Sequence, residues 1–295
     1  MVHDLNELSG ALRPEYWDSF AKVYARLGSP LTPCGDDARF MEGAADQWVA
    51  SHRSERLHAL LLGVTPGLTQ ISWPPGSCLT AIDRSLAMVR AIWPGDVASV
   101  RWALQADWLA LPLRESSFGM VVGDGSINVL RYPEGYRALA RSVRAALGAD
   151  GTFALRAFVQ PAVKEDPADV IAGLPRNASF HHFKLRLLMA LQPSAEEGSH
   201  LNRIYDYWTG SGIDRAALAL QTGWNRDEID TIDRYQGLAA FYTFPTLEEL
   251  RARLGEFFGE ISALVPSYDM GKGCPTLVMR PLPKWARRRR VATIR

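Results

Sequence analysis

Between residues 57 and 158, short apolar runs alternate with segments of helical period, and this alternation constrains the fold more than any other feature of the sequence. Runs that are apolar on both faces suit parallel strands buried inside a sheet. They cover residues 57–62, 78–82, 118–122 and 152–158, with a weaker run at 100–104. Helical patterns lie between them at 85–93 and 133–147. The alternation predicts an α/β fold in which helices cover both faces of a doubly wound, mostly parallel sheet.

The segments that flank this alternation predict mainly helices. A helix over residues 13–27 places Trp17 and Phe20 on one apolar face, and a polar helix follows over 36–52. After Phe158 the alternation stops for about a hundred residues, far more than one crossover connection needs. The helices expected in this long insertion cover residues 166–174, 180–191, 200–208, 214–221 and 226–240.

The chain then returns to the sheet. Thr246 and Glu249 form a capping box that opens a helix over 247–254. Two strands over 260–265 and 276–280 complete a seven-stranded sheet, and residues 284–295 form a basic tail that contains Arg287 to Arg290. Such a tail is usually a solvated end, and contact with RNA or an acidic partner is the alternative.

Composition excludes several classes of protein. Hydrophobic residues make up 47% and charged residues 22% of the chain, which predicts a packed core rather than disorder. The net charge of +1 argues against nucleic acid as a partner. No apolar stretch reaches the roughly 20 residues of a membrane helix, and the N-terminus does not resemble a signal peptide, so we expect a cytoplasmic protein without a membrane partner. Cys34, Cys78 and Cys274 are too widely spaced for a zinc site, so we predict no metal.

Polar and small residues follow the expected strands, at the edge where open parallel sheets bind ligands. Gly63 ends the first strand, and Asp83 ends the second about 20 residues later, the separation at which a carboxylate accepts both hydroxyls of an adenosine ribose. Asp107 and Trp108 follow the third strand, where the acid could accept from an adenine amino group while the ring stacks on the base. The turn at 123–128 follows the fourth strand and is rich in small residues, so a ligand could rest against its backbone.

Each of these motifs also has an ordinary structural interpretation. Gly63 could belong to a plain strand-to-helix turn, and Asp107 could cap a turn. Asp83 could cap the next helix, but Ser85 already fills that position. The residues at 123–128 could form a turn without any ligand.

In these motifs the sequence resembles the class I S-adenosylmethionine-dependent methyltransferases. The resemblance covers about residues 57–160 and the last two strands, and it implies a Rossmann-like fold with S-adenosylmethionine as cofactor. The first motif of that family has an acid two positions before its first glycine, followed by alternating glycines. Here Leu61 occupies the acid position and Thr65 replaces the middle glycine, so only Gly63 and Gly67 remain. The cofactor contacts implied by the resemblance are Gly63, Val64, Thr65, Pro66, Asp83, Arg84, Met88, Ala106, Asp107, Trp108, Gly123, Asp124 and Gly125.

The resemblance also suggests a role for each part of the chain. Residues 1–56 would form an N-terminal helical cap, and residues 57–158 the cofactor-binding core. The insertion at 159–255 would be a lid over the methyl acceptor or a dimer surface, so a homodimer is one expectation. Residues 256–283 would supply the last two strands, which form the hairpin typical of this fold.

Asp124, His181 and His182 are the candidates for catalytic chemistry. Asp124 or an N-terminal residue could hold the cofactor's amino group in place of the acid missing at Leu61, and Asp124 could instead act as the base for the acceptor. Histidine is the usual base near neutral pH. Adjacent residues on a helix do not face each other, so a surface position at the start of a helix is the alternative for the histidine pair.

Acceptor contacts are expected from the N-terminal helix, the insertion and the ends of the central strands. Aromatic residues at helical spacing are usually core, but one or two could line the acceptor pocket. An arginine at position 156, 186 or 203 could hold an anionic acceptor. The acceptor-binding candidates are Tyr16, Tyr24, Ser126, Asn128, Arg156 and Trp208.

Together these features predict a methyltransferase that acts on a small-molecule acceptor, by O- or N-methylation and with a carboxylate or hydroxyl among the possible acceptors. The sulfonium methyl would be transferred by in-line attack, and the protein would mainly supply alignment and desolvation. One alternative is an NAD(P)-dependent oxidoreductase, although residues 63–67 lack its Gly-x-Gly-x-x-Gly turn. The other is a non-catalytic module that binds S-adenosylmethionine, which the incomplete first motif supports.

Overall fold

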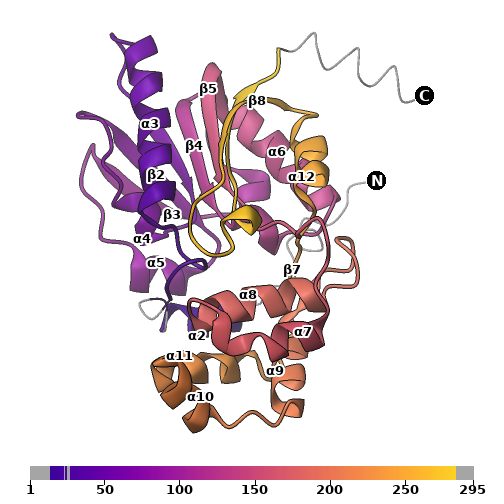
Figure 1. Ribbon diagram of the computed structural model, residues 1–295. Coiled ribbons are helices and arrows are strands. Elements are labelled where there is room, and N and C mark those ends of the chain that lie inside the picture. Colours follow the sequence, from indigo (N-terminus) through magenta and orange to yellow (C-terminus); the bar gives the residue numbers. More distant parts are fainter. Residues whose placement is uncertain (1–13, 23, 25–26, 284–295) are drawn as a thin grey trace.

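A single mixed sheet of seven strands organises the molecule, seen in a computed structural model that describes residues 14–22, 24 and 27–283 (Figure 1). The strands are β1 (His58–Leu62), β2 (Cys78–Asp83), β3 (Arg101–Gln105), β4 (Phe118–Asp124), β5 (Leu147–Arg156), β8 (Phe258–Leu264) and β9 (Thr276–Pro281). Their order across the sheet is β3-β2-β1-β4-β5-β9-β8. Strands β1 to β5 pair in parallel, whereas β9 is antiparallel to both β5 and β8. The predicted α/β fold with a mostly parallel, seven-stranded sheet is therefore confirmed.

Helices cover both faces of the sheet because the central strands are apolar on both sides. On one face lie α3 (Gly35–Ser51), α4 (Pro66–Thr69) and α5 (Leu86–Ile92), and on the other lie α6 (Glu134–Ala146) and α12 (Leu247–Leu254). Leu61 packs with Met41 of α3, and its neighbour Leu60 packs with Leu139 of α6. All three layers depend on this alternation of side chains along each strand.

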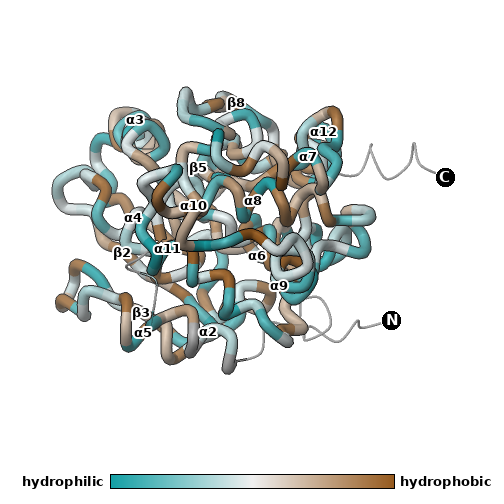
Figure 2. Tube along the Cα trace, turned by 60° about the horizontal axis from the view of Figure 1, so that its bottom comes forward, coloured by the Kyte–Doolittle hydropathy of each residue, from teal (hydrophilic) through white to brown (hydrophobic). Residues whose placement is uncertain are grey.

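The insertion forms a third core beyond the end of the sheet. Its helices are α7 (Pro167–Ala172), α8 (Phe180–Leu191), α9 (Leu201–Gly210), α10 (Arg215–Thr222) and α11 (Arg226–Ile229). Phe180, Phe183 and Trp208 pack at its centre, and Tyr16 of α2 (Pro14–Ala21) joins them. Because the chain enters the insertion from the carboxyl end of β5, these helices gather at that end of the sheet, at the bottom of Figure 1. Figure 2, in which this end comes forward, also places α2 beside α5.

Two predicted elements differ from the structure. The predicted N-terminal helix over 13–27 is shorter, because α2 ends at Ala21. The helix predicted over 226–240 is replaced by α11, a 3-10 helix at Asp230–Tyr235 and a short strand, β7 (Phe241–Tyr242). Gly237 has a φ of +67°, a left-handed conformation that interrupts any helix here, and β7 instead pairs with β6 (Ser199–His200).

Neither the residues before Pro14 nor the predicted basic tail with Arg287 to Arg290 is among the described residues. Within the described ranges, no helix combines the length and the apolar character needed to cross a membrane.

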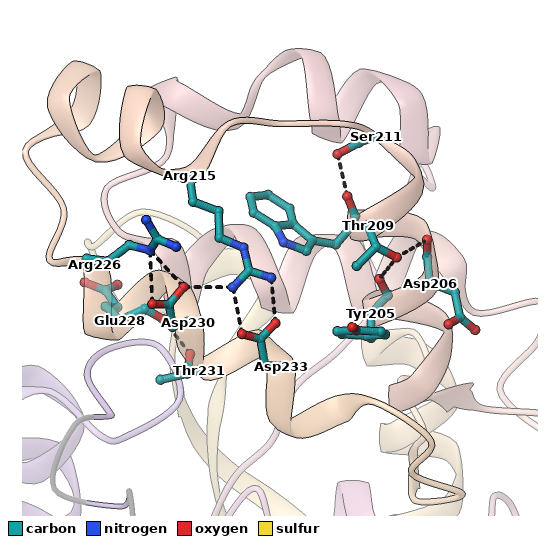
Figure 3. A network of polar contacts seen from close by, with 11 residues as sticks. Tyr205, Asp206, Thr209, Ser211, Arg215, Arg226, Glu228, Asp230, Thr231 and Asp233 are labelled. Carbon is teal, nitrogen blue, oxygen red and sulfur yellow. Dashed lines mark hydrogen bonds and ion pairs between the residues drawn. The ribbon is translucent and has the colours of Figure 1, made fainter.

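An arginine-centred network fastens α10 to the 3-10 helix that follows α11 (Figure 3). Arg215 lies between two carboxylates, with Nη1 at 2.8 Å from Asp230 and Nη2 at 2.6 Å from Asp233. Arg226 also pairs with Asp230, at 2.9 Å. These groups are partly exposed, so salt screens them.

We therefore expect Arg215→Ala to lower the free energy of unfolding by about 1 kcal/mol at low ionic strength and by less at about 1 M salt. Urea denaturation at the two salt concentrations measures both values. Arg226→Ala, which removes one ion pair instead of two, should have a smaller effect. An Arg215→Ala variant as stable as the parent at low salt would contradict this assignment.

Candidate functional site

A cavity opens at the carboxyl edge of the sheet, where β1, β2 and β4 end. It has a volume of about 580 Å³ including its open mouth, and a neighbouring hollow of about 490 Å³ continues it. The two parts share Trp17, Asp83, Trp108 and Val129 in their walls. The carboxyl ends of the strands are where open parallel sheets bind their ligands.

The turn after β1 forms one wall of the cavity. Gly63 has a φ of +111°, a conformation that side chains rarely allow. A Cβ atom at this position would lie 3.7 Å from the Trp108 ring and 3.8 Å from the Asp83 carboxylate. The bare backbone of Gly63 therefore faces the same space as these two side chains, and Thr65 lines it as well.

Asp83 presents a largely buried carboxylate at the end of β2. Its Oδ1 accepts a hydrogen bond from the backbone N–H of Ser85 at 2.8 Å, and Ser85 itself caps α5. Burial raises the pKa of Asp83 to about 6, although backbone N–H groups of Ser85 and Val64 oppose the shift. Burial makes the ionised carboxylate costly at this position. Hydroxyl groups of a ligand that donate hydrogen bonds to it would therefore stabilise it.

This raised pKa makes a pH dependence testable. Ionised Asp83 destabilises the free protein, so its contribution to stability falls as the pH rises from about 4 to 6. A ligand whose hydroxyls donate to Asp83 prefers the ionised form. Its affinity should therefore rise up to about tenfold per pH unit below pH 6 and level off above it. Calorimetric titration with S-adenosylmethionine between pH 5 and 8 measures how the affinity depends on pH. If the Asp83→Asn variant shows the same pH dependence as the parent, Asp83 is not its source.

Asp107 and Trp108 extend the wall beside Asp83. Asp107 caps the turn that follows it, because its Oδ1 accepts a hydrogen bond from the Leu109 N–H at 2.9 Å. This is the structural role that the sequence offered as the alternative to adenine binding. Its other oxygen lies 3.6 Å from Nη1 of Arg84, and both residues line the smaller part of the cavity. Trp108 donates from Nε1 to the carbonyl of Ile82 at 2.6 Å, which fixes the plane of the indole in the wall.

Asp124 lies at the end of β4 in a buried ion pair. Its Oδ1 accepts from Nη1 of Arg156 at 2.6 Å, and the Arg156 side chain is 0% exposed. Burial raises the pKa of Asp124, and the guanidinium opposes that shift. Arg156 also bonds the Pro30 carbonyl and the Tyr268 hydroxyl, and Asp37 lies at its Nε. The prediction that Arg156 holds an anionic acceptor is therefore wrong, because protein groups occupy its guanidinium.

Aromatic side chains form the side of the cavity that faces α2 and the insertion. They are Trp17, Phe20, Tyr24, Phe158 and Tyr242. Tyr16 stands behind this wall, with its hydroxyl 3.1 Å from that of Tyr242, so this predicted acceptor contact does not line the cavity. Burial raises the pKa of Tyr24, which also contacts Thr65.

Ser126, in the turn after β4, lines the cavity, and its hydroxyl is buried. The side chain is 3% exposed, and among the described residues its Oγ has no hydrogen-bond partner. The neighbouring Gly125 adopts a φ of +59°, which turns the chain sharply at the strand end. A buried hydroxyl without a partner is costly, so this position suits a polar ligand atom.

Two more of the predicted acceptor contacts, Asn128 and Trp208, lie away from the cavity. Asn128 is fully buried, with Nδ2 donating to the carbonyls of Phe158 and Thr243 at 2.7 Å each and Oδ1 accepting from the Phe158 N–H. It fastens the strand-end turn to the insertion instead of binding an acceptor. Trp208 packs inside the insertion core.

The histidine pair also lies outside this site. His181 and His182 are 3% and 5% exposed, so the alternative of a surface position is wrong too. The Nδ1 atom of His182 lies 2.8 Å from Ser179 Oγ, and Nε2 of His181 lies 3.8 Å from Glu228. Neither residue lines the cavity, and burial lowers the pKa of His182.

The structure thus brings most of the predicted cofactor contacts together. Those that line the cavity are Gly63, Thr65, Asp83, Arg84, Met88, Asp107, Trp108, Asp124 and Gly125. Val64, Pro66, Ala106 and Gly123 do not line it. Gly123 instead allows close packing, since a Cβ there would come within 2.5 Å of Ser126 Oγ. Sequence reasoning missed Leu31, Val129 and Phe158, which carry no signal beyond being apolar. Across the described ranges, no three His, Cys, Asp or Glu side chains gather as a metal site would require.

No family model and no curated protein matches this sequence. Among solved structures, a methyltransferase named CcbJ from Streptomyces caelestis has 14% identity and a TM-score of 0.52, over 91% of this chain and 98% of its own. A protein of Rhodobacter sphaeroides, named as a candidate Zn-dependent alcohol dehydrogenase, has 12% identity and a TM-score of 0.54, over 96% and 100% of the chains. With its antiparallel β9 between β5 and β8, the chain has the class I methyltransferase fold.

Proposed function

We propose that the protein is an S-adenosylmethionine-dependent methyltransferase with a small-molecule acceptor. The observation that carries this proposal is the position of Asp83, a largely buried carboxylate at the end of β2 that faces a cavity beside Gly63 and Trp108. In folds of this kind the ligand lies at the carboxyl ends of the central strands, and the acid after the second strand accepts from the ribose.

The residues of the cavity fit this cofactor. Asp83 would accept the two ribose hydroxyls, and the Trp108 ring would stack on the adenine. The turn with Gly125 and Ser126 would run beside the methionine portion, where the unpartnered Ser126 Oγ would gain a hydrogen bond. When bound, the cofactor supplies a methyl group activated by the sulfonium.

The lining of the cavity favours an acceptor that does not need a strong base. Asp124 is paired with Arg156, and burial raises the pKa of Tyr24, so neither is well suited to remove a proton. Among the described residues, no histidine lines the cavity. We therefore favour an amine or an acidic hydroxyl over an alcohol. A carboxylate is less favoured, because Arg156 is not free to hold it.

The aromatic wall would orient the acceptor and exclude water. Residues 159–255 and α2 would then act as the lid, residues 57–158 and 256–283 as the cofactor-binding core, and a homodimer through the insertion remains a prediction. Trp17 lines both parts of the cavity, so it would contact cofactor and acceptor together.

We expect Trp17→Ala to reduce turnover at least about tenfold and to weaken cofactor binding less, because it opens the cavity to water. Trp17→Phe should restore most of the turnover. Single-turnover methyl transfer and calorimetry on the same samples measure the two effects. Equal losses in both would show that Trp17 belongs to the cofactor site alone.

An NAD(P)-dependent oxidoreductase is the alternative that the Rhodobacter protein's name raises. In the dinucleotide-binding fold the strand order is 3-2-1-4-5-6, so the sixth strand of the chain lies next to the fifth. Here the antiparallel β9 takes the place beside β5. That arrangement favours the methyltransferase.

Two measurements test the proposal. Calorimetric titration should detect S-adenosylmethionine and not NADH, and a cofactor with a labelled methyl group should label the small-molecule fraction of a metabolite extract. Binding of NADH alone would support the oxidoreductase. Binding of S-adenosylmethionine without transfer to any acceptor would support the non-catalytic module.

A further inference from the structure

A cluster of three charged side chains is buried behind the cavity. The Arg156 guanidinium lies between two carboxylates, with Nη1 at 2.6 Å from Asp124 and Nε at 3.2 Å from Asp37. The side chains of Arg156 and Asp37 are 0% exposed and that of Asp124 is 5% exposed. With two acids and one base, the cluster has a formal charge of −1.

Separate parts of the chain hold the second acid in place. Asp37 lies in the first turn of α3, where its Oδ2 accepts from the Cys34 N–H at 3.0 Å as part of a capping box. The Tyr268 and Thr276 hydroxyls lie 3.4 Å from its two oxygens. The partial positive charge at a helix N-terminus further stabilises this anion.

Asp124 is the member of the cluster that lines the cavity. Among the described residues, its Oδ1 bonds Arg156, whereas no hydrogen bond to its Oδ2 is found. Leu61, at the position of the missing acid, is wholly buried in the core of the sheet and offers no charge. If Asp124 and Arg156 were alone, their charges would cancel at the cavity wall. The carboxylate of Asp37 restores a net negative charge there.

We propose that Asp37 and Arg156 are positioning residues that make Asp124 the anionic partner of the cofactor's methionine ammonium group. Arg156 fixes the carboxylate in place, and Asp37 offsets the charge of Arg156. The inference rests on the proposed function, since it identifies how the same cavity recognises the amino-acid portion of the cofactor. An ammonium group in a partly dry cleft needs such a partner.

Two thioether ligands separate this role from a merely structural one. S-adenosylhomocysteine and 5′-methylthioadenosine share the adenosine and the sulfur, but only the first has an amino-acid portion. Asp124→Asn should weaken S-adenosylhomocysteine by about tenfold to a hundredfold. Asp37→Asn should weaken it by about threefold to tenfold, because its charge acts from farther away. The affinity of 5′-methylthioadenosine should change by less than about twofold in both variants, since the loss is confined to the ammonium interaction.

Thr276→Val is the matched control, because it removes a hydroxyl next to Asp37 without changing any charge. It should leave the ratio of the two affinities unchanged. If Asp37→Asn alters both ligands equally, or neither, Asp37 has only a structural role and the inference is overturned. If Asp37→Asn does not fold, the ratio of the two ligand affinities is measured in Asp124→Asn instead. A ratio unchanged from the parent overturns the inference. A parent protein that binds neither ligand would instead overturn the proposed function.

Discussion

Asp83→Ala should weaken the binding of S-adenosylmethionine by about 2–4 kcal/mol, the largest loss that we expect from any cofactor contact. The variant removes the charged partner of two hydroxyls that become buried in the complex. It also removes a carboxylate whose pKa burial raises to about 6, so the free protein should not lose stability at neutral pH. Calorimetry measures the affinity, and circular dichroism checks the fold.

Asp107→Ala is the matched control for this experiment. Asp107 lines the same hollow but caps the 3-10 helix that follows it, so its removal should cost only about 1 kcal/mol of stability, with a smaller effect on affinity. A correctly folded Asp83→Ala variant that binds S-adenosylmethionine as tightly as the parent would remove Asp83 from the site.

Arg156→Met should lower the free energy of unfolding by about 3–5 kcal/mol at neutral pH. The variant leaves Asp37 and Asp124 buried without the cation that lies between them. Protonation of Asp124, whose pKa burial raises, relieves part of the penalty, so the difference from the parent should shrink as the pH falls. Urea denaturation at pH 5 and pH 8 measures both differences.

Methionine nearly preserves the volume of the arginine stem, so a large loss would report the charges and not a cavity. Adding Asp124→Asn to the same chain should recover part of the lost stability, since one unpaired carboxylate is gone. A loss below about 1 kcal/mol, or one that is independent of pH, would show that the cluster is not ionised as described.

The part of the fold that follows from local pattern could be predicted from the sequence. The helical period over residues 180–191 matches α8, and the strand-end motifs at Gly63 and Asp83 do converge, because the carboxyl ends of parallel strands share one edge. One boundary error arises where a single residue overrides a pattern. Gly237 adopts a left-handed conformation, so the helical turns that begin at residue 226 do not continue to residue 240.

The residues that pair across the fold could not be predicted in this way. Asp37 has the ordinary sequence signature of a first-turn helix acid, and nothing near it in the chain indicates Arg156. Asn128 looks like a polar turn residue, yet three hydrogen bonds to Phe158 and Thr243 occupy its amide. These roles depend on tertiary contacts between distant segments, which neither periodicity nor spacing encodes.

A crystal structure with S-adenosylhomocysteine bound would show whether the cavity at the carboxyl edge of the sheet holds the cofactor. We predict the ribose hydroxyls within hydrogen-bond distance of Asp83, the adenine against the Trp108 ring and the amino group beside Asp124. A ligand bound elsewhere in the molecule, or a carboxyl-edge cavity that excludes it at millimolar concentration, would contradict the claim that this cavity is the cofactor site.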